Sequence, residues 1–196
     1  MKKLFLLLLT GFSFAAADAQ IQFGVKAGAN MANFTGNDVS GTKWKIGFHG
    51  GALVAVPLFN EFSLQPEVVY SSQGTKVDQQ DYTATMNSNY LNIPVLFKYN
   101  NPSGFFLETG PQLGFLMSAK AKSGSVSVDE KSAYKSTDFS WAFGLGYLIS
   151  GLNAGIDARY NLGVSNIVKD SNNGTAKNSV FQLGIFYLFG QKAGNK

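Results

Sequence analysis

One histidine and seven charged residues recur at alternate positions within stretches that are otherwise apolar. Side chains of these types bind ions, transfer protons or line a selective pore. Because side chains alternate between the two faces of a strand, this spacing places the polar groups on one face and the apolar groups on the other. The residues that we expect to share the interior of one fold are Lys26, Lys45, His49, Glu67, Lys98, Glu108, Asp157 and Arg159.

Two roles are open to these interior charges: a selectivity lining, or a packed polar filling in which opposite charges meet. Buried charges have to pair, because leaving water costs several kcal/mol per ion. We expect Glu67 and Glu108 to meet Lys98, and Asp157 to meet Arg159. We favour the packed filling, because side chains alone can fill the inside of a small barrel.

Catalysis would have to involve His49, the only histidine. An acyl-transfer enzyme needs a serine and a carboxylate within hydrogen-bond reach of that ring. Ser63, Ser71 and Ser140 are expected on the same face, but no serine motif surrounds them. Groups that act on lipid must also lie near a rim or the outer face, whereas His49 is expected inside. We therefore predict no enzyme activity, no cofactor and no metal, since one histidine without cysteine makes a poor zinc site.

The elements that must hold these residues are strands. From Ile21 onward, the chain contains eight stretches that alternate with period two, of about 10 to 13 residues each, compared with ~9–11 for a tilted membrane strand. Their polar face is rich in glycine and other small residues, which suits the crowded inside of a narrow barrel. The stretches are 21–33, 45–56, 62–73, 90–99, 105–117, 140–149, 152–163 and 179–189.

Tyrosines mark the apolar face near the expected strand ends, as in the aromatic girdles of membrane barrels. They are Tyr70, Tyr99, Tyr147, Tyr160 and Tyr187. We predict an all-β fold, an eight-stranded antiparallel up-and-down transmembrane β-barrel. A secreted lipocalin-like barrel with the two faces exchanged would fit the same alternation, but the glycine-rich polar face and the tyrosines favour the membrane. Proline removes a ladder hydrogen bond, so we expect local bulges at Pro66, Pro94 and Pro111.

The connections between these stretches alternate between short and long, which is the outer-membrane pattern of short periplasmic turns and longer surface loops. The short connections are 57–61, 100–104 and 150–151, and the long ones are 34–44, 74–89, 118–137 and 165–178. With an even number of strands, both termini lie on the short-turn side. We therefore predict the outer membrane of a Gram-negative cell, with periplasmic termini.

The first 19 residues have the features of a secretory signal peptide. Lys2 and Lys3 precede an apolar run from Leu4 to Ala16, and Ala17-Asp18-Ala19 fits a cleavage site. We expect a signal peptide over 1–19 and one barrel domain over 20–196. The basic residues are scattered and the net charge is only +4, which argues against nucleic acid as a partner.

Four segments carry a resemblance to a known family. The stretch 90–99 (YLNIPVLFKY) resembles a strand of the PorT-like outer-membrane β-barrel family of Bacteroidetes, and 108–116, 23–32 and 159–163 are similar to further strands. The resemblance implies an outer-membrane barrel of about eight strands. The name-giving member of that family participates in protein secretion, but no motif here distinguishes that role.

The expected function is that of a non-enzymatic outer-membrane barrel. We expect it to act through its four long loops, in surface binding, adhesion or envelope structure. Its expected partners are outer-membrane lipid and an extracellular ligand or envelope protein, and we expect a monomer. Two alternatives stay open: a narrow porin-like channel for small solutes, and a lipid-modifying barrel enzyme that uses His49.

Overall fold

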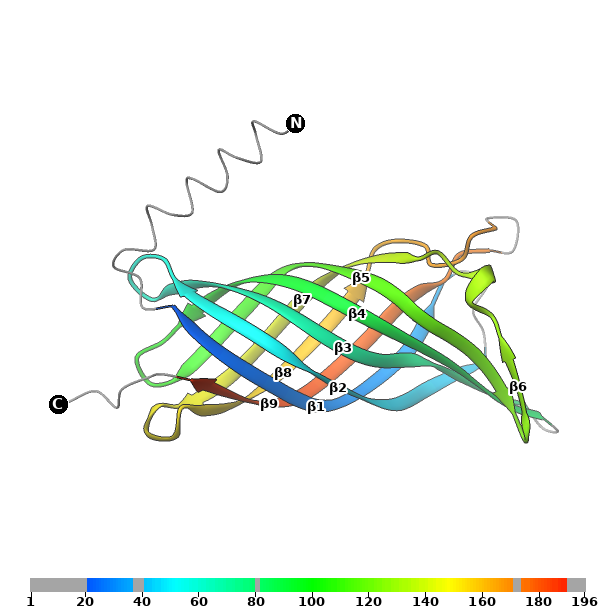
Figure 1. The fold of residues 1–196 in the computed structure, drawn as a ribbon, viewed down its shortest axis with the longest axis horizontal. Coiled ribbons are helices and arrows are strands. Elements are labelled where there is room, and N and C mark those ends of the chain that lie inside the picture. The colour runs from blue at the N-terminus through cyan, green and yellow to red at the C-terminus, as the bar shows by residue number, and fades with distance from the viewer. Residues whose placement is uncertain (1–20, 37–40, 80–81, 171–173, 190–196) are drawn as a thin grey trace, which may run out of the picture.

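The computed structural model describes residues 21–36, 41–79, 82–170 and 174–189, and the predicted signal peptide lies outside this part of the chain. The described chain is built almost entirely from strands (Figure 1). They are β1 (Gln22–Thr35), β2 (Thr42–Pro57), β3 (Phe62–Gln79), β4 (Tyr82–Asn100), β5 (Phe105–Ser123), β6 (Val126–Asp129), β7 (Thr137–Ile149), β8 (Ala154–Gly163) and β9 (Lys177–Phe189), with one-turn 3₁₀ helices η1 (Lys131–Ala133) and η2 (Ser150–Leu152). Neither of these helices is long enough to cross a membrane.

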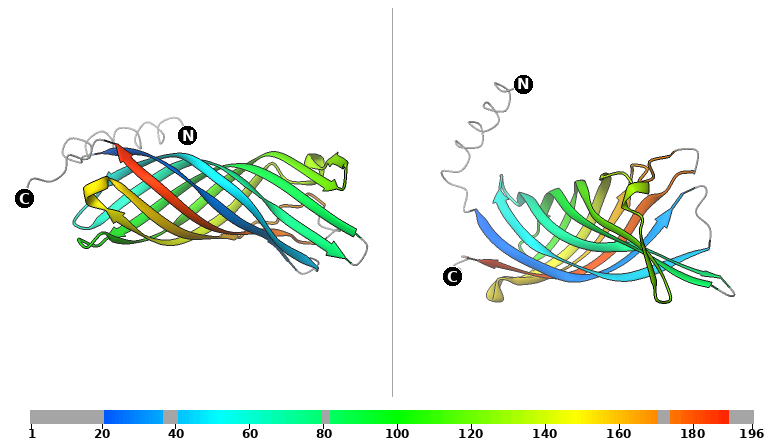
Figure 2. Two further views of the ribbon diagram at one scale, coloured as in Figure 1. Left: turned by 90° about the horizontal axis from the view of Figure 1, so that it is seen from below. Right: turned by 45° about the vertical axis from the view of Figure 1, so that its right-hand side comes forward.

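Eight of the strands close into a barrel in which sequential neighbours pair antiparallel. Closure is made by β1, which pairs with both β2 and β9, and by the pairing of β4 with β5. The ninth strand, β6, pairs with β5 beyond the barrel wall and forms a projecting hairpin (Figures 1 and 2). The predicted all-β, eight-stranded antiparallel barrel is confirmed.

The apolar face of the strands points outward. Phe23, Ile46 and Ile185, for example, expose 61 %, 74 % and 65 % of their surface, although each belongs to a strand of the barrel wall with a neighbour on both sides. A soluble barrel would bury such side chains inside, so the lipocalin-like alternative is wrong for this fold. Tyr99, Tyr147 and Tyr187 are exposed near the ends of their strands at the short-turn rim, as an aromatic girdle requires. Tyr160 is exposed near the end of β8, at the long-loop end, whereas Tyr70 lies in the middle of β3.

The strands run farther at the long-loop end than the sequence indicated. Residues 74–89, expected as a loop, continue as β3 and β4, which leaves only 80–81 between them. The pairing continues from Thr75↔Met86 to Gln79↔Tyr82. One face of this part of the hairpin mixes buried polar residues, Thr75 and Ser88, with the apolar Val77, Ala84 and Met86, so no purely apolar face marks it. The apolar alternation that marks a membrane strand therefore stops before the strand itself does.

The bulges predicted at the three prolines are absent from the described strands. Beside each proline the ladder omits two residue pairs and then resumes in the same register, as from Leu53↔Glu67 to Val56↔Leu64 around Pro66. A missing N–H therefore costs a ladder bond without inserting a residue. The register shifts lie elsewhere, between Trp44 and His49 and between Asn89 and Tyr90.

Inward glycines make room for large interior side chains. A Cβ added to Gly144 would lie 2.8 Å from Oε1 of Glu108, and one added to Gly28 would lie 2.6 Å from Cε1 of His49. A Cβ on Gly146 would overlap the ring of Phe106. The glycine bias of the polar face is thus the counterpart of the bulky polar and aromatic groups that fill the lumen.

Candidate functional site

The centre of the lumen is an arginine that spans the barrel. Arg159 on β8 donates from Nη1 and Nη2 to the two carboxylate oxygens of Glu67 on β3, at 2.9 Å each. Its Nε also donates to Oε1 of Glu108 on β5, at 2.8 Å. In the order of the barrel, β8 and β3 lie on opposite walls. One guanidinium therefore ties three strands together through charge-assisted bonds.

Two lysines complete this group of charges. Lys26 Nζ lies 3.3 Å from Oδ1 of Asp157 and 3.7 Å from Oε2 of Glu67, and Lys98 Nζ lies 3.6 Å from Oε2 of Glu108. The group contains three positive and three negative side chains, so its formal charge is zero. Each of them exposes between 2 % and 5 % of its surface. We call these six residues the lumen network: Lys26, Glu67, Lys98, Glu108, Asp157 and Arg159.

The predicted partners differ in part from the observed ones. Lys98 does meet Glu108, but it reaches Glu67 only through Gln65, which accepts from Lys98 at 2.9 Å and donates to Glu67 at 2.7 Å. The predicted pairing of Asp157 with Arg159 is wrong, since Asp157 pairs with Lys26 on β1. Asp157 and Arg159 are two positions apart on one strand, and the long arginine reaches across the lumen instead of along its own wall.

The other two predicted interior residues lie in neighbouring polar layers. Lys45 is buried and donates to the carbonyl of Gln73 at 3.1 Å and to Ser72 Oγ at 3.4 Å. His49 is 2 % exposed, and its Nδ1 lies 2.8 Å from Oδ1 of Asn30. Because that oxygen is an acceptor, Nδ1 carries the proton.

His49 is not arranged as a catalytic base. Ser71 is its Cα partner across β2 and β3, but the Ser71 hydroxyl accepts from the side chains of Asn30 and Gln73. Both His49 and Ser71 are buried from solvent. Within the described residues, no group of three histidine or carboxylate side chains is placed to hold a metal ion.

The short-turn end of the lumen contains a cluster of apolar side chains that the sequence alternation did not reveal as a group. Leu53, Phe106, Phe186 and Leu188 form a buried cluster, with Leu148 packed against it. The ammonium group of Lys98 lies 3.7 Å from the centroid of the Phe106 ring. This cation–π contact joins the lumen network to the cluster. The signal was present in the alternation, which places Phe106 of β5 and Phe186 of β9 on the same face as the polar residues.

The long-loop end is closed by the connections themselves. The segment that includes η1 pairs with the β8–β9 connection through an isolated bridge between Tyr134 and Val168 and through Lys135 N to Ile167 O at 2.8 Å. Ile167 is fully buried against Phe34 and Ala176. Burial raises the pKa of the Tyr134 hydroxyl, and the nearby Glu130 carboxylate adds to this effect. That hydroxyl therefore stays protonated at neutral pH.

Exposed charge is distributed unequally between the two ends. Of the eleven lysines in the described residues, Lys26, Lys45 and Lys98 are buried. The other eight all lie at the long-loop end: Lys43, Lys76, Lys120, Lys122, Lys131, Lys135, Lys169 and Lys177. At the long-loop end, four described positions outside the lumen are acidic: 78, 129, 130 and 170. At the short-turn end, the only acidic residue in the described turns is Glu61. Asp38 and Asp81 fall outside the described residues.

Comparison with solved structures finds the same fold at low sequence identity. The attachment invasion locus protein Ail of Yersinia pestis matches with a TM-score of 0.50 and 16 % identity, over 86 % of this chain and 98 % of Ail. Neisserial surface protein A matches with a TM-score of 0.51 and 15 % identity, over 84 % of this chain and 96 % of that protein. No curated protein sequence matches the chain. Such identities establish a shared fold and leave function open.

The family model described as the outer membrane protein beta-barrel domain matches residues 14–169, well over half of the chain. This match and the outward apolar face support an outer-membrane location. The narrower resemblance to PorT-like proteins of Bacteroidetes stays a prediction. The chain belongs to the outer membrane protein beta-barrel domain family.

Proposed function

We propose that this protein is a non-enzymatic surface-binding barrel whose long-loop end binds a polyanionic polysaccharide. The observation that carries the proposal is the gathering of all eight unburied lysines of the described chain at that end. A surface with such an excess of ammonium groups attracts sulfated or phosphorylated polymers, mainly through long-range electrostatics. On this proposal the termini are periplasmic, the long loops face the outside of the cell, and the protein binds its ligand as a monomer.

Part of the basic surface lies where β2 and β3 leave the barrel. Lys43 and Lys76 are direct Cα partners across the two strands. The ammonium group of Lys45 is buried, where it donates to the carbonyl of Gln73. The exposed indole of Trp44 separates Lys43 from Lys45 along β2. Anionic substituents of a sugar polymer can meet the exposed pair Lys43 and Lys76.

A structural relative supports the class of ligand. Ail has been solved in complex with the heparin analogue sucrose octasulfate, and that structure matches this chain with a TM-score of 0.52 at 16 % identity. The likeness to Ail concerns the fold alone. Binding of a polyanion by this chain therefore has to be argued from its own lysines. Two of them, Lys43 and Lys76, face each other across one pair of strands, which distinguishes them from a general positive charge.

A narrow channel and a lipid-modifying enzyme are less well supported. The apolar cluster at one end, the folded connections at the other and the lumen network between them all occupy the path that a solute would take. His49, the residue that catalysis would need, is buried and bonded to Asn30. If His49→Ala changed the profile of lipid A or phospholipids in the membrane, the enzyme alternative would be restored.

Binding of sucrose octasulfate to the refolded barrel in neutral detergent, measured by calorimetry over a range of salt, tests the proposal. We expect Lys43→Gln/Lys76→Gln to weaken binding by about tenfold, since two charge-assisted contacts are lost. The matched control, Lys131→Gln/Lys135→Gln, removes the same charge elsewhere on the loop end and should weaken binding by about threefold or less. Equal losses in the two variants, or no binding at low salt, would refute the proposal.

A further inference from the structure

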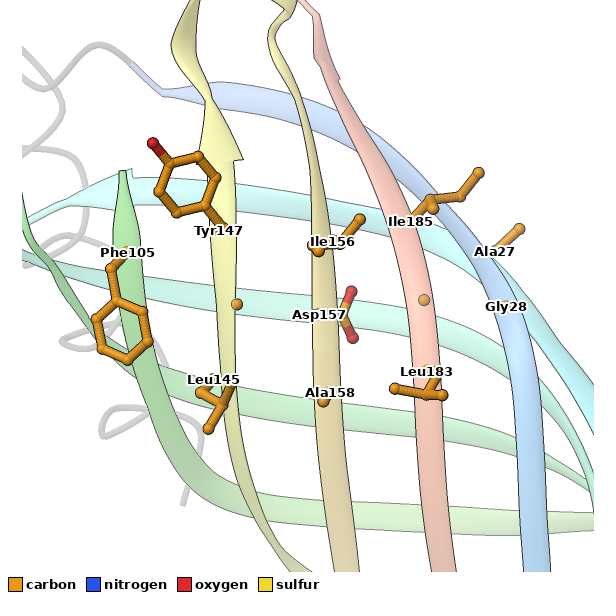
Figure 3. Close-up of a pocket in the computed structure, with 12 residues that line it drawn as sticks. Ala27, Gly28, Phe105, Leu145, Tyr147, Ile156, Asp157, Ala158, Leu183 and Ile185 are labelled. Carbon is orange, nitrogen blue, oxygen red and sulfur yellow. The ribbon is translucent and has the colours of Figure 1, made fainter. Parts of the chain in front are cut away.

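The outer wall of the barrel contains a broad apolar hollow in its short-turn half. It has a volume of about 720 Å³ and is formed by five neighbouring strands, β1, β9, β8, β7 and β5 (Figure 3). A second hollow of about 450 Å³ adjoins it and shares Ala27, Ile156 and Ile185 with it. It extends the depression toward Ile149, Ala154 and Tyr187, close to the short-turn rim.

The register explains why the wall is hollowed here. One row across the wall runs Ala27, Ile185, Ile156, Tyr147 and Phe105, and the next runs Ala29, Leu183, Ala158, Leu145 and Leu107. The alanines on β1 and β8 lie beside large side chains on the strands around them. Figure 3 shows the small side chains of Ala27 and Ala158 among the larger groups that surround the hollow. The outer surface of the wall is therefore recessed at the alanines and raised by the larger side chains around them.

The chemistry of the hollow fits hydrocarbon. Its exposed lining is apolar, and Ile156, Leu183 and Ile185 expose more than half of their surface toward it. In a membrane this face meets acyl chains, which are as apolar as leucine, so the hydrophobic effect gives no preference for one contact over another. Van der Waals contact decides instead, and a flexible chain gains more of it in a hollow than on a convex wall.

A second copy of the barrel is a poorer occupant. A twofold interface places the same patch of both subunits face to face. Two concave patches that face each other leave a void, which loses the contacts that drive association in a membrane. An acyl chain can bend into the hollow, and its headgroup would lie near the hydroxyls of Tyr147 and Tyr187 at the rim.

We propose that this outer-wall hollow binds one acyl chain of a phospholipid from the leaflet nearer the short turns. The site lies on the lipid-facing wall, so it is separate from the polysaccharide site at the long-loop end. It holds a single lipid more tightly than the lipids that surround the rest of the wall. Substituting one floor residue with a larger apolar side chain should make the hollow shallower without touching the lumen.

The probe is palmitoyl-oleoyl phosphatidylethanolamine, offered to the folded protein in vesicles and followed by native mass spectrometry after transfer to detergent. We expect one lipid to remain on the unsubstituted protein at an activation that removes the others. Ala158→Leu should lower the fraction of one-lipid complexes by about fivefold, which corresponds to about 1 kcal/mol of lost contact. The matched control is Ala52→Leu, which adds the same side chain to an exposed position on β2 outside the hollow.

Gel migration of unboiled samples must show that both variants are folded. The proposal is overturned if Ala158→Leu retains lipid as well as the control does, or if the unsubstituted protein carries a broad distribution of lipids with none preferred. Dimers that Ala158→Leu abolishes would also overturn it, because they would make a second copy the occupant.

Discussion

Replacing Arg159 with methionine should expose how much the lumen network contributes to stability. The guanidinium is bonded to Glu67 at 2.9 Å twice and to Glu108 at 2.8 Å. At an effective dielectric constant of about 20, each of the two charge pairs contributes about 4 kcal/mol of Coulomb energy. Part of that gain offsets the cost of burying the guanidinium itself. Since two carboxylates are left buried with one cation fewer, we expect unfolding to become easier by about 3–5 kcal/mol.

The informative comparison is with the double variant Arg159→Met/Glu67→Gln. It removes one charge of each sign, so the network is again neutral, with Lys26 beside Asp157 and Lys98 beside Glu108. We expect it to recover at least about 2 kcal/mol relative to Arg159→Met, since a neutral replacement of a buried pair costs little.

The assay is reversible urea unfolding of the barrel in detergent micelles or thin vesicles, followed by tryptophan fluorescence and by gel migration of unboiled samples. Lys169→Met, which removes an exposed lysine, serves as the control and should change the free energy of unfolding by about 0.5 kcal/mol or less. If Arg159→Met costs less than about 1 kcal/mol, or if Arg159→Met/Glu67→Gln costs as much as Arg159→Met and Glu67→Gln measured separately and added, the network is not the tightly coupled structural core described here.

Two further predictions concern the interior. Gly144→Ala places a methyl group 2.8 Å from Oε1 of Glu108, so it should lower stability by about 1–3 kcal/mol in the same urea assay. Gly151→Ala, which meets open space, should be close to neutral, and equal effects of the two substitutions would contradict the steric account. Ile167→Asp buries a charge in the folded connections at the long-loop end, so limited proteolysis should cut that end faster while the barrel keeps its heat-modifiable migration. Unchanged proteolysis would show that Ile167 does not hold the connections in place.

The alternation of the sequence was sufficient to predict the barrel, because a strand with one face in lipid must repeat with period two. It also identified the residues that face inward, from Lys26 on β1 to Arg159 on β8. The same rule failed where strands leave the membrane, as in 74–89, since neither face there has to be apolar. The prediction of bulges at the prolines was also wrong, because the loss of one N–H donor does not force a bulge.

The partners inside the lumen could not be read from spacing alone. Arg159 pairs with Glu67 on the opposite wall and not with Asp157 on its own strand. Which carboxylate the guanidinium reaches depends on the width of the closed barrel. The apolar closure at the short-turn end was missed for a related reason. Phe106 and Phe186 lie on the inner face among polar residues, and only the register shows that they meet.

The central claim is that the lumen is closed by its own side chains, and planar-bilayer recording tests it most directly. With the refolded barrel inserted in a bilayer in concentrated potassium chloride, we predict a current at the level of the bare membrane. Discrete conductance steps whose ion selectivity changes in Lys98→Gln or Glu108→Gln would contradict the claim, because they would place both side chains along an open path.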